Sequence, residues 1–335
     1  MLKDLFIFVP CFDHCNIKTM APYRIINGVG LVPIGQTSVE SGAFEGCTEL
    51  TEIIIPETVT EIGDFAFMGC TALKEVVLPM SVTRIGEFAF SGCTALARVV
   101  LPPTLTSIGN DAFSRCTALP RVDIPWSVTE IGEYAFMECA ALQEIAISPR
   151  VKEVRFRTFQ GCTSLVRAAI PDSVTEIMYK AFQGCTALKD VAIPSRVTTI
   201  GSYAFADCAS LEEITIPDTT TEVGSNSFDG CTNLLAATLR CNIDLMNPDI
   251  FGKCRRMQSL TIDGDIRKFH KKFFDDIDGS LTKVRIPFGT MRFYKNLIPV
   301  KLYGVISELP EPPLTLRGYI KGLLDKRRMK EKKTR

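Results

Sequence analysis

The chain has 335 residues, of which 46% are hydrophobic and 23% are charged, a composition typical of an ordinary globular protein. Its 38 basic and 38 acidic residues cancel, so the whole chain generates no field that would attract nucleic acid or an acidic membrane. The sequence contains no apolar run of about 18 residues, and we therefore expect no membrane-spanning helix.

The N-terminal segment is apolar but interrupted. Asp4 and Pro10 break a stretch that a secretory signal would keep apolar after a basic start, so we predict a cytoplasmic location, with the cell surface as the alternative. Cys11, His14 and Cys15 are residue types that bind metals, but no second pair follows nearby. An irregular cap is the favoured interpretation of this segment.

From Phe44 onward the chain repeats every 23 residues. Cysteine, phenylalanine and leucine each keep this spacing, and Met257 continues the leucine series. A fixed period of this length indicates a solenoid, in which each unit is one coil and neighbouring coils share a core. The cysteines are Cys47, Cys70, Cys93, Cys116, Cys139, Cys162, Cys185, Cys208, Cys231 and Cys254.

The unit 70–92 serves as a template for one coil. Residues 73–78 end in the period-two alternation of a strand with one face inward, and Pro79 ends that strand. Residues 82–85 are a second short extended piece. Residues 87–93 space their small and aromatic side chains as one inward-facing helical turn. Each coil is therefore predicted to be a strand, a turn, a short strand and a helical turn.

The regular cysteines are predicted to form a buried ladder. Side chains stacked in register point the same way, which disfavours the torsion of a disulfide even where the distance allows one. Buried thiols behave as small hydrophobic groups and fill such positions well. We therefore expect reduced thiols in the core, and a cross-linked ladder is the alternative.

The unit has the pattern Cys-x-x-Leu-x-x-Ile-x-Ile-Pro-x-x-Val-x-x-Ile-Gly-x-x-Ala-Phe, which resembles the BspA-like, Treponema-type leucine-rich repeat. The resemblance covers roughly residues 30–290 and implies an α/β repeat, a leucine-rich-repeat solenoid with stacked parallel strands and about ten to eleven coils. It suggests roles in protein binding or at cell surfaces and carries over no catalytic residue. The pattern weakens at both ends, so we assign 1–29 to an irregular cap, 30–300 to the solenoid and 301–335 to a linker, a short helix and a basic tail.

The sequence offers little for catalysis. With only His14 and His270, a histidine-based triad or a multi-histidine metal site has almost nothing to draw on. His270 takes the turn position that Gly63 holds in its own unit. The segment 276–279 matches part of a calcium loop, but the third acid and the final Glu are absent, and a solvated turn is favoured. We predict no catalytic, metal or cofactor site and therefore no enzyme.

Apolar residues occupy outward positions in several consecutive units. Val77 and Val100 stand between the two inward residues of their strands, and Met80, Pro103 and Trp126 follow the prolines that end the strands. Exposed apolar patches often mark interaction sites, and Trp is frequent among binding hot spots. These five residues are our candidate partner-binding face. Ordinary packing of β-forming residues in a parallel sheet is the alternative explanation.

The unit 139–161 departs from the pattern through its basic residues, and the next unit adds two more. Stacking is predicted to gather them on an outer edge that would hold an acidic partner, and solvated surface charge is the alternative. The basic tail 326–335 would likewise contact nucleic acid or anionic lipid, although such ends are usually solubilising. The candidate basic patch consists of Arg150, Lys152, Arg155, Arg157, Arg167 and Lys180.

The sequence therefore predicts a non-enzymatic interaction module that binds a protein or peptide, or a glycan, through the exposed surface of the solenoid. A cell-surface or secreted adhesin-like protein of the same fold is the alternative. We expect no cofactor, and apart from the basic tail there is no strong signal for nucleic acid or a membrane.

Overall fold

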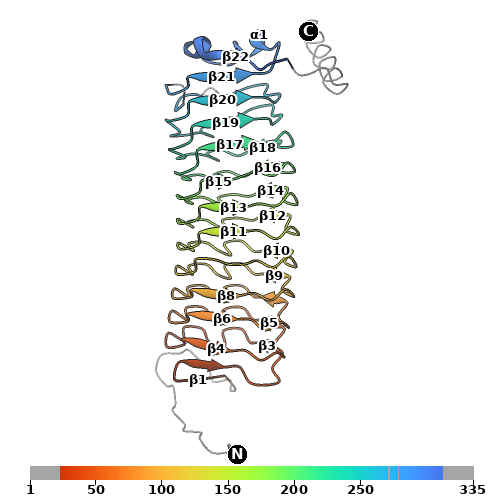
Figure 1. Cartoon of the computed structure of the whole chain (residues 1–335), viewed down its shortest axis with the longest axis vertical. Coiled ribbons are helices and arrows are strands. Elements are labelled where there is room, and N and C mark those ends of the chain that lie inside the picture. Colours follow the sequence, from red (N-terminus) through yellow and green to blue (C-terminus); the bar gives the residue numbers. More distant parts are fainter. Residues whose placement is uncertain (1–22, 271, 278, 312–335) are drawn as a thin grey trace, which may run out of the picture.

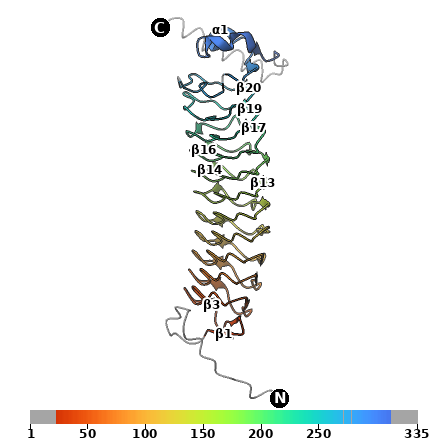
Figure 2. The ribbon, with the colours of Figure 1, turned by 90° about the vertical axis from the view of Figure 1, so that its left-hand side faces the viewer.

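The computed structural model describes residues 23–270, 272–277 and 279–311. The coils stack along one axis into an elongated solenoid of about 12 turns with nearly no helix (Figures 1 and 2). The strand β1 (Arg24–Ile26) and the helix α1 (Met291–Tyr294) lie at opposite ends of the stack. The predicted solenoid of stacked parallel strands is confirmed.

One side of the solenoid is the first ladder, to which nearly every coil contributes a strand (Figure 1). Within each sheet of this ladder the strands pair in parallel at a spacing of one coil, so that Val77 lies opposite Val100. The pairing is interrupted between β4 and β6, between β8 and β11 and between β15 and β17. At the N-terminal end β1 pairs antiparallel with β2. Between β8 and β11 a single bridge joins Arg121 to Glu144. The strands are β2 (Val29–Leu31), β4 (Glu52–Ile54), β6 (Glu75–Val77), β8 (Arg98–Val100), β11 (Glu144–Ala146), β13 (Arg167–Ala169), β15 (Asp190–Val191), β17 (Glu213–Ile216), β19 (Ala236–Leu239), β20 (Ser259–Ile262), β21 (Lys283–Ile286) and β22 (Ile306–Glu308).

The second ladder runs along another side and consists of two-residue strands. Each begins with a residue that is at least partly exposed and ends with a buried aliphatic residue, as a strand with one buried face requires. The strands are β3 (Ser38–Val39), β5 (Glu61–Ile62), β7 (Arg84–Ile85), β9 (Ser107–Ile108), β10 (Glu130–Ile131), β12 (Glu153–Val154), β14 (Glu176–Ile177), β16 (Thr199–Ile200) and β18 (Glu222–Val223).

The third side, here called the turn ladder, differs from the predicted helical turn. Phe88 and Gly92 have φ angles of 54° and 73°, which a right-handed helix does not contain. Some N–H groups bond within the coil, as Ser91 N does to Phe88 O at 3.0 Å. Others bond to the next coil, as Phe90 N does to Ala112 O at 2.8 Å. The expectation of a helical turn is therefore wrong, and consecutive turns joined to the neighbouring coils replace it.

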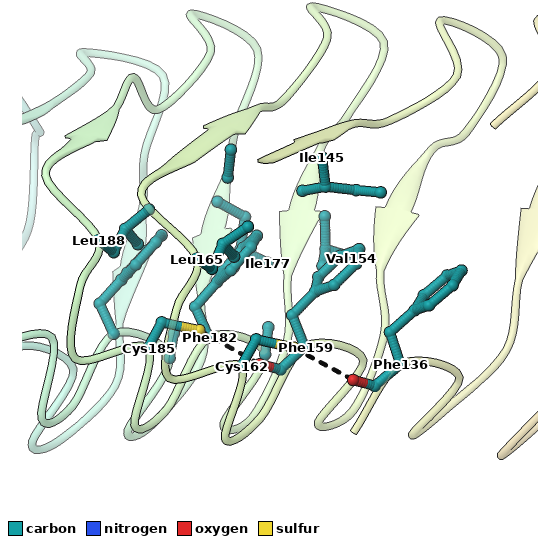
Figure 3. Packing of buried hydrophobic residues seen from close by; sticks show 14 of the residues in the cluster. Phe136, Ile145, Val154, Phe159, Cys162, Leu165, Ile177, Phe182, Cys185 and Leu188 are labelled. Atoms are coloured by element: carbon teal, nitrogen blue, oxygen red, sulfur yellow. Dashed lines mark hydrogen bonds between the residues drawn. The ribbon is translucent and has the colours of Figure 1, made fainter. Parts of the chain in front are cut away.

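The interior is filled by ladders of identical side chains, as predicted (Figure 3). Phenylalanine rings of consecutive coils stack with centroids 5.1 to 5.7 Å apart from Phe44 to Phe251. The repeated leucines and cysteines are fully buried. Each side chain of this size contributes about 1.5–3 kcal/mol of burial energy, once per coil. The inward face of the turn ladder therefore agrees with the sequence even though its backbone does not.

The second ladder is interrupted between β10 and β12, which belong to different sheets. In most coils a glycine follows the short strand and bonds to the previous coil, as Gly132 N does to Ile108 O at 2.9 Å. A Cβ on Gly132 would lie 2.5 Å from Asn110 N, so glycine gives this coil the room for its close approach. The same bond also forms at two positions without glycine, because Met178 N bonds to Val154 O at 2.8 Å and His270 N bonds to Met246 O at 2.9 Å. Arg155 takes the equivalent position. Among the described residues its N–H has no backbone bond to Ile131 O, and the ladder opens there.

The chain ends extend the stack in the described region. The hairpin of β1 and β2 lies at the start, and β22 continues the first ladder to residue 308 after a 3-10 helix, η1 (Val300–Val305). The predicted division at residues 29 and 300 stays a prediction. Cys11, His14 and Cys15, the helix expected near 314–324 and the basic tail lie outside the described residues.

Candidate functional site

The apolar ridge predicted from the sequence begins on the first ladder, where the strand pleat turns alternate residues to solvent. Ile54 and Val77 are 58% and 51% exposed, and Val100 is partly exposed beside Val77. Their strand neighbours Val76 and Val99 are buried. The outward orientation assigned to Val77 and Val100 is therefore what the structure shows.

The ridge continues in the turns after the strands. Met80 and Trp126 are 60% and 65% exposed, and Pro103 on the coil between them is exposed as well. The guanidinium carbon of Arg150 lies 5.6 Å from the centroid of the Trp126 ring. Ser148 donates its hydroxyl to the carbonyl of Trp126 at 3.0 Å. The next coil thus contacts both the backbone and the ring of Trp126, while the residue stays 65% exposed.

The six residues of the basic patch are not gathered on one edge. Arg150 lies beside Trp126, and Arg167 begins β13 of the first ladder, where its Nε is 3.0 Å from an oxygen of Asp190. Arg155 follows β12 of the second ladder and forms an ion pair with Glu130 at 2.6 Å. The structure therefore spreads these residues over several sides of the solenoid, and carboxylates neutralise two of them.

Lys152, Arg157 and Lys180 have a different environment. Lys152 is exposed just before β12. Arg157 and Lys180 lie one coil apart on the turn ladder, each in the left-handed conformation, with φ of 53° and 59°. Only these two of the six basic residues share one position of the coil. They are the part of the patch that stacking does bring together.

Aromatic rings surround this pair, and the sequence reasoning did not find them. Arg157 lies 5.5 Å from the ring centroid of Tyr134 and 5.7 Å from that of Tyr179. Lys180 lies 5.1 Å from the centroid of Tyr179 and 5.4 Å from that of Tyr203. Tyr134 and Tyr203 keep the 23-residue spacing with Arg157 and Lys180. The signal was therefore present in the sequence register.

The cysteine ladder offers no reactive thiol in the described part of the chain. Cys162 donates its thiol to the carbonyl of Phe136 at 3.2 Å, and Cys185 does the same to Phe159 (Figure 3). Burial raises the pKa of the Cys139 and Cys185 thiols to about 12. A thiol is nucleophilic only as a thiolate, so these groups are packing elements. The predicted buried ladder is confirmed.

In the described part of the chain, no group of three or more His, Cys, Asp or Glu side chains is arranged to hold a metal ion. His270 takes the glycine position predicted for it, and its N–H bonds to Met246 O at 2.9 Å. No helix in this part of the chain has both the length and the apolar character needed to cross a membrane.

A family model described as the BspA type leucine-rich repeat region, with six copies, matches residues 37–166 and 152–280. No curated protein matches the chain. The solved structure of a leucine-rich repeat protein from Bacteroides ovatus is 29% identical, with 84% of this chain and 76% of that chain covered and a TM-score of 0.67.

Two further solved structures have lower scores. A leucine-rich repeat protein from T. pallidum is 28% identical, with 57% of this chain and 87% of that chain covered and a TM-score of 0.44. The pneumococcal vaccine antigen PcpA is 18% identical, with 83% of this chain and 76% of that chain covered and a TM-score of 0.50. The likeness to the pneumococcal antigen concerns the fold alone.

Proposed function

Because this chain belongs to the BspA-type leucine-rich repeat family, we propose that it is a non-catalytic binding protein that recognises a protein or peptide through the apolar ridge. The family suggests an interaction or surface role without naming a partner. The single observation that carries the proposal is the row of exposed apolar side chains on consecutive coils. Its members are Ile54, Val77, Met80, Val100, Pro103 and Trp126.

The ridge has the composition of a binding surface. A large aromatic side chain with an apolar surround is the usual centre of a protein interface, and a polar rim surrounds such centres. Trp126 supplies the aromatic group, and the ion pair of Arg98 with Glu75, both well exposed, lies on the same two strands as Val77 and Val100. The backbones of these strands pair with each other along the axis. A partner would therefore be held by side-chain contacts with the ridge.

The test is a double variant, Trp126→Ser with Met80→Ser. A photo-crosslinking amino acid at Pro103 captures the partner from the native cells, and the affinity of the purified partner is then measured for each variant. Loss of both apolar side chains is expected to weaken binding by about 10- to 100-fold, because hot-spot truncations cost about 2 kcal/mol or more. Both side chains are exposed, so the thermal midpoint should hardly change.

The matched control is Leu245→Ser with Phe288→Ser. These two apolar residues are 44% and 51% exposed and lie on coils toward the other end of the solenoid. The control should bind the partner as the unmodified chain does. Equal affinities for the ridge variant and the unmodified chain would rule out the ridge as the contact surface.

The location of the chain is part of the proposal. We place it in the cytoplasm, as the sequence predicts, and the cell-surface or adhesin-like role is the alternative. Protease added to intact cells distinguishes the two, because a surface protein is cleaved or released while a cytoplasmic one is protected until the cells are lysed.

A further inference from the structure

The strip on the turn ladder from Tyr134 to Tyr203 combines cations and aromatic rings on successive coils. Arg157 lies between the rings of Tyr134 and Tyr179, and Lys180 lies between those of Tyr179 and Tyr203, at the centroid distances given above. All five side chains are partly exposed. Tyr134, Arg157, Lys180 and Tyr203 share one position of the coil. The coils before and after them have Asp111 and Asn226 at this position, so the strip ends on both sides.

Within the described part of the chain the two cations have no acidic partner. Arg84, Arg98, Arg115, Arg155 and Arg167 each form an ion pair with a carboxylate of this chain. Neither Arg157 nor Lys180 has a carboxylate oxygen within 4.0 Å in the described part of the chain. The pKa of the Tyr179 phenol is lowered by hydrogen bonding and charge from Lys180, with a further contribution from Arg157. This direction agrees with an excess of positive charge around the ring.

Tyr134, Arg157, Lys180 and Tyr203 occupy the left-handed position of their turns, with φ between 53° and 59°. The equivalent residues of other coils, such as Phe65 and Phe88, have the same conformation, so it belongs to the repeat and not to this strip alone. What distinguishes the strip is that this position places cations against aromatic rings on consecutive coils.

We propose that this strip, made of Tyr134, Arg157, Tyr179, Lys180 and Tyr203, binds an acidic polysaccharide. The guanidinium and ammonium groups hold carboxylate or sulfate groups, since charge-assisted hydrogen bonds to such anions are the strong ones. Phenol groups and the amide of Gln183, a partly exposed residue in the same turns, hydrogen-bond the sugar hydroxyls. A linear polymer along the axis presents its charged groups to consecutive coils.

Two other polyanions fit the strip less well. Single-stranded nucleic acid binds by stacking bases on open ring faces, whereas Arg157 and Lys180 both lie over the Tyr179 ring and a base would have to displace them. An acidic peptide that adds as a strand needs free backbone groups. Here Arg157 N bonds to Tyr179 O and Lys180 N bonds to Ser202 O, each at 3.1 Å.

The experiment measures binding of the full chain to heparin, a sulfated polysaccharide, and to polygalacturonate, a carboxylated one, by titration calorimetry. The variant Arg157→Gln with Lys180→Gln is expected to bind at least about 10-fold more weakly, because two charge-assisted contacts are lost. Arg157→Lys keeps the charge and is expected to stay within about 3-fold of the unmodified chain. Circular dichroism and the thermal midpoint establish that each variant is folded.

The control variant is Lys152→Gln with Arg196→Gln, which removes the same charge from exposed sites outside the strip. It should bind within about 3-fold of the unmodified chain, since surface charge elsewhere contributes little at physiological salt. Every variant retains the basic tail, so the difference between variants isolates the strip. The ridge variant, Trp126→Ser with Met80→Ser, should bind both polysaccharides normally, because this site is separate from the proposed protein-binding ridge.

Three outcomes would overturn the proposal. The first is that the unmodified chain binds neither polysaccharide, and the second is that the double variant binds as tightly as the unmodified chain. The third is that oligothymidylate or polyglutamate of matched charge displaces heparin as efficiently as polygalacturonate does, which would indicate binding to any polyanion. Dextran, a neutral polysaccharide, serves as the blank.

Discussion

Single buried thiols form a continuous column through this protein. Every repeated cysteine from Cys70 to Cys254 bonds through its sulfur to the carbonyl of a phenylalanine 26 residues earlier. The thiol therefore fills a small apolar site and satisfies a carbonyl that faces the core. This dual role explains why a cysteine, and not an alanine, suits the position in each coil.

The ladder predicts an alkaline limit to stability. Burial raises the pKa of the ladder thiols Cys93, Cys139, Cys185 and Cys254 from 9.0 to about 12, and it does the same for Cys241, which lies outside the ladder. Between pH 9 and about 12 the unfolded chain releases these protons and the folded chain keeps them, so stability is full below pH 9 and falls as pH rises. Each thiol removes about 1.4 kcal/mol per pH unit in this window. Urea titrations from pH 7 to 10.5 should show a steep loss of unfolding free energy above pH 9.

The variant Cys139→Ala supplies the control for this prediction. It loses packing energy at neutral pH, but it also removes one titrating group, so its stability should fall less steeply above pH 9. An unchanged slope in Cys139→Ala, or a flat profile for the unmodified chain, would show that the buried thiols do not control the alkaline transition.

At the scale of one coil, two kinds of glycine solve two different problems. Gly92 has φ of 73°, and a Cβ there would be 3.8 Å from the nearest atoms of the neighbouring coil, so conformation alone favours glycine. Arg115 and Glu138 hold the same position in other coils with φ of 60° and 59°. Gly132 has an ordinary backbone angle, but its Cβ would lie 2.5 Å from backbone atoms of the previous coil. The first kind forms the turn ladder, and the second kind allows the second ladder to close.

These two roles predict different costs for the same substitution. Gly92→Ala should lower the unfolding free energy by about 1–2 kcal/mol, the cost of a left-handed residue with a side chain. Gly132→Ala should cost about 1–3 kcal/mol through overpacking and should also open the ladder between β9 and β10. Urea denaturation measures the first quantity, and amide exchange of residue 132 detects the second. Slow exchange in Gly132→Ala would contradict the proposed close-approach role.

The turn ladder shows where sequence reasoning on this fold succeeds and where it fails. The period predicted the burial of Phe90 and Cys93 because burial depends only on which positions recur. Their spacing fits a helical turn as well as two consecutive turns. The left-handed position before them holds Phe88 in this coil and Arg157 in another, and neither residue favours that conformation. In this coil Gly92, which also has a positive φ, was the local signal against a helix.

The candidate sites were predictable to different degrees for a related reason. The outward position of Val77 follows from the strand alternation, so the ridge was found. A coil of 23 residues passes three sides, so the stretch from Arg150 to Arg157 crosses all of them, and closeness in sequence did not mean closeness in space. The contact of Arg157 with Tyr134 could have been predicted by comparing equivalent positions of neighbouring coils, because the two residues are 23 residues apart.

For the whole molecule, the backbone bonds between coils are not uniform along the axis. The turn ladder links neighbouring coils from Gly42 to Gly252. The second ladder is divided between β10 and β12 at Arg155, and the first ladder is divided between β4 and β6, between β8 and β11 and between β15 and β17. In a stacked array each coil is stabilised mainly by its neighbours, so stability is set by the coil-to-coil interfaces. At the interface around Arg155 the second ladder is open and the first ladder is reduced to the single bridge from Arg121 to Glu144, so it is the weakest candidate in the middle of the stack.

We expect unfolding to separate the solenoid at this interface. In increasing urea, amide exchange read by mass spectrometry should show coils on the two sides of residues 139–161 losing protection at different concentrations, because a weak interface uncouples the two parts. Arg155→Gly should bring the two transitions together, since glycine allows residue 155 to bond to Ile131 O as Gly132 bonds to Ile108. It also removes the ion pair with Glu130, a surface contact of about 0–1 kcal/mol. A single transition shared by all coils of the unmodified chain would mean that the turn ladder and the phenylalanine column couple the stack strongly enough to override the open ladder.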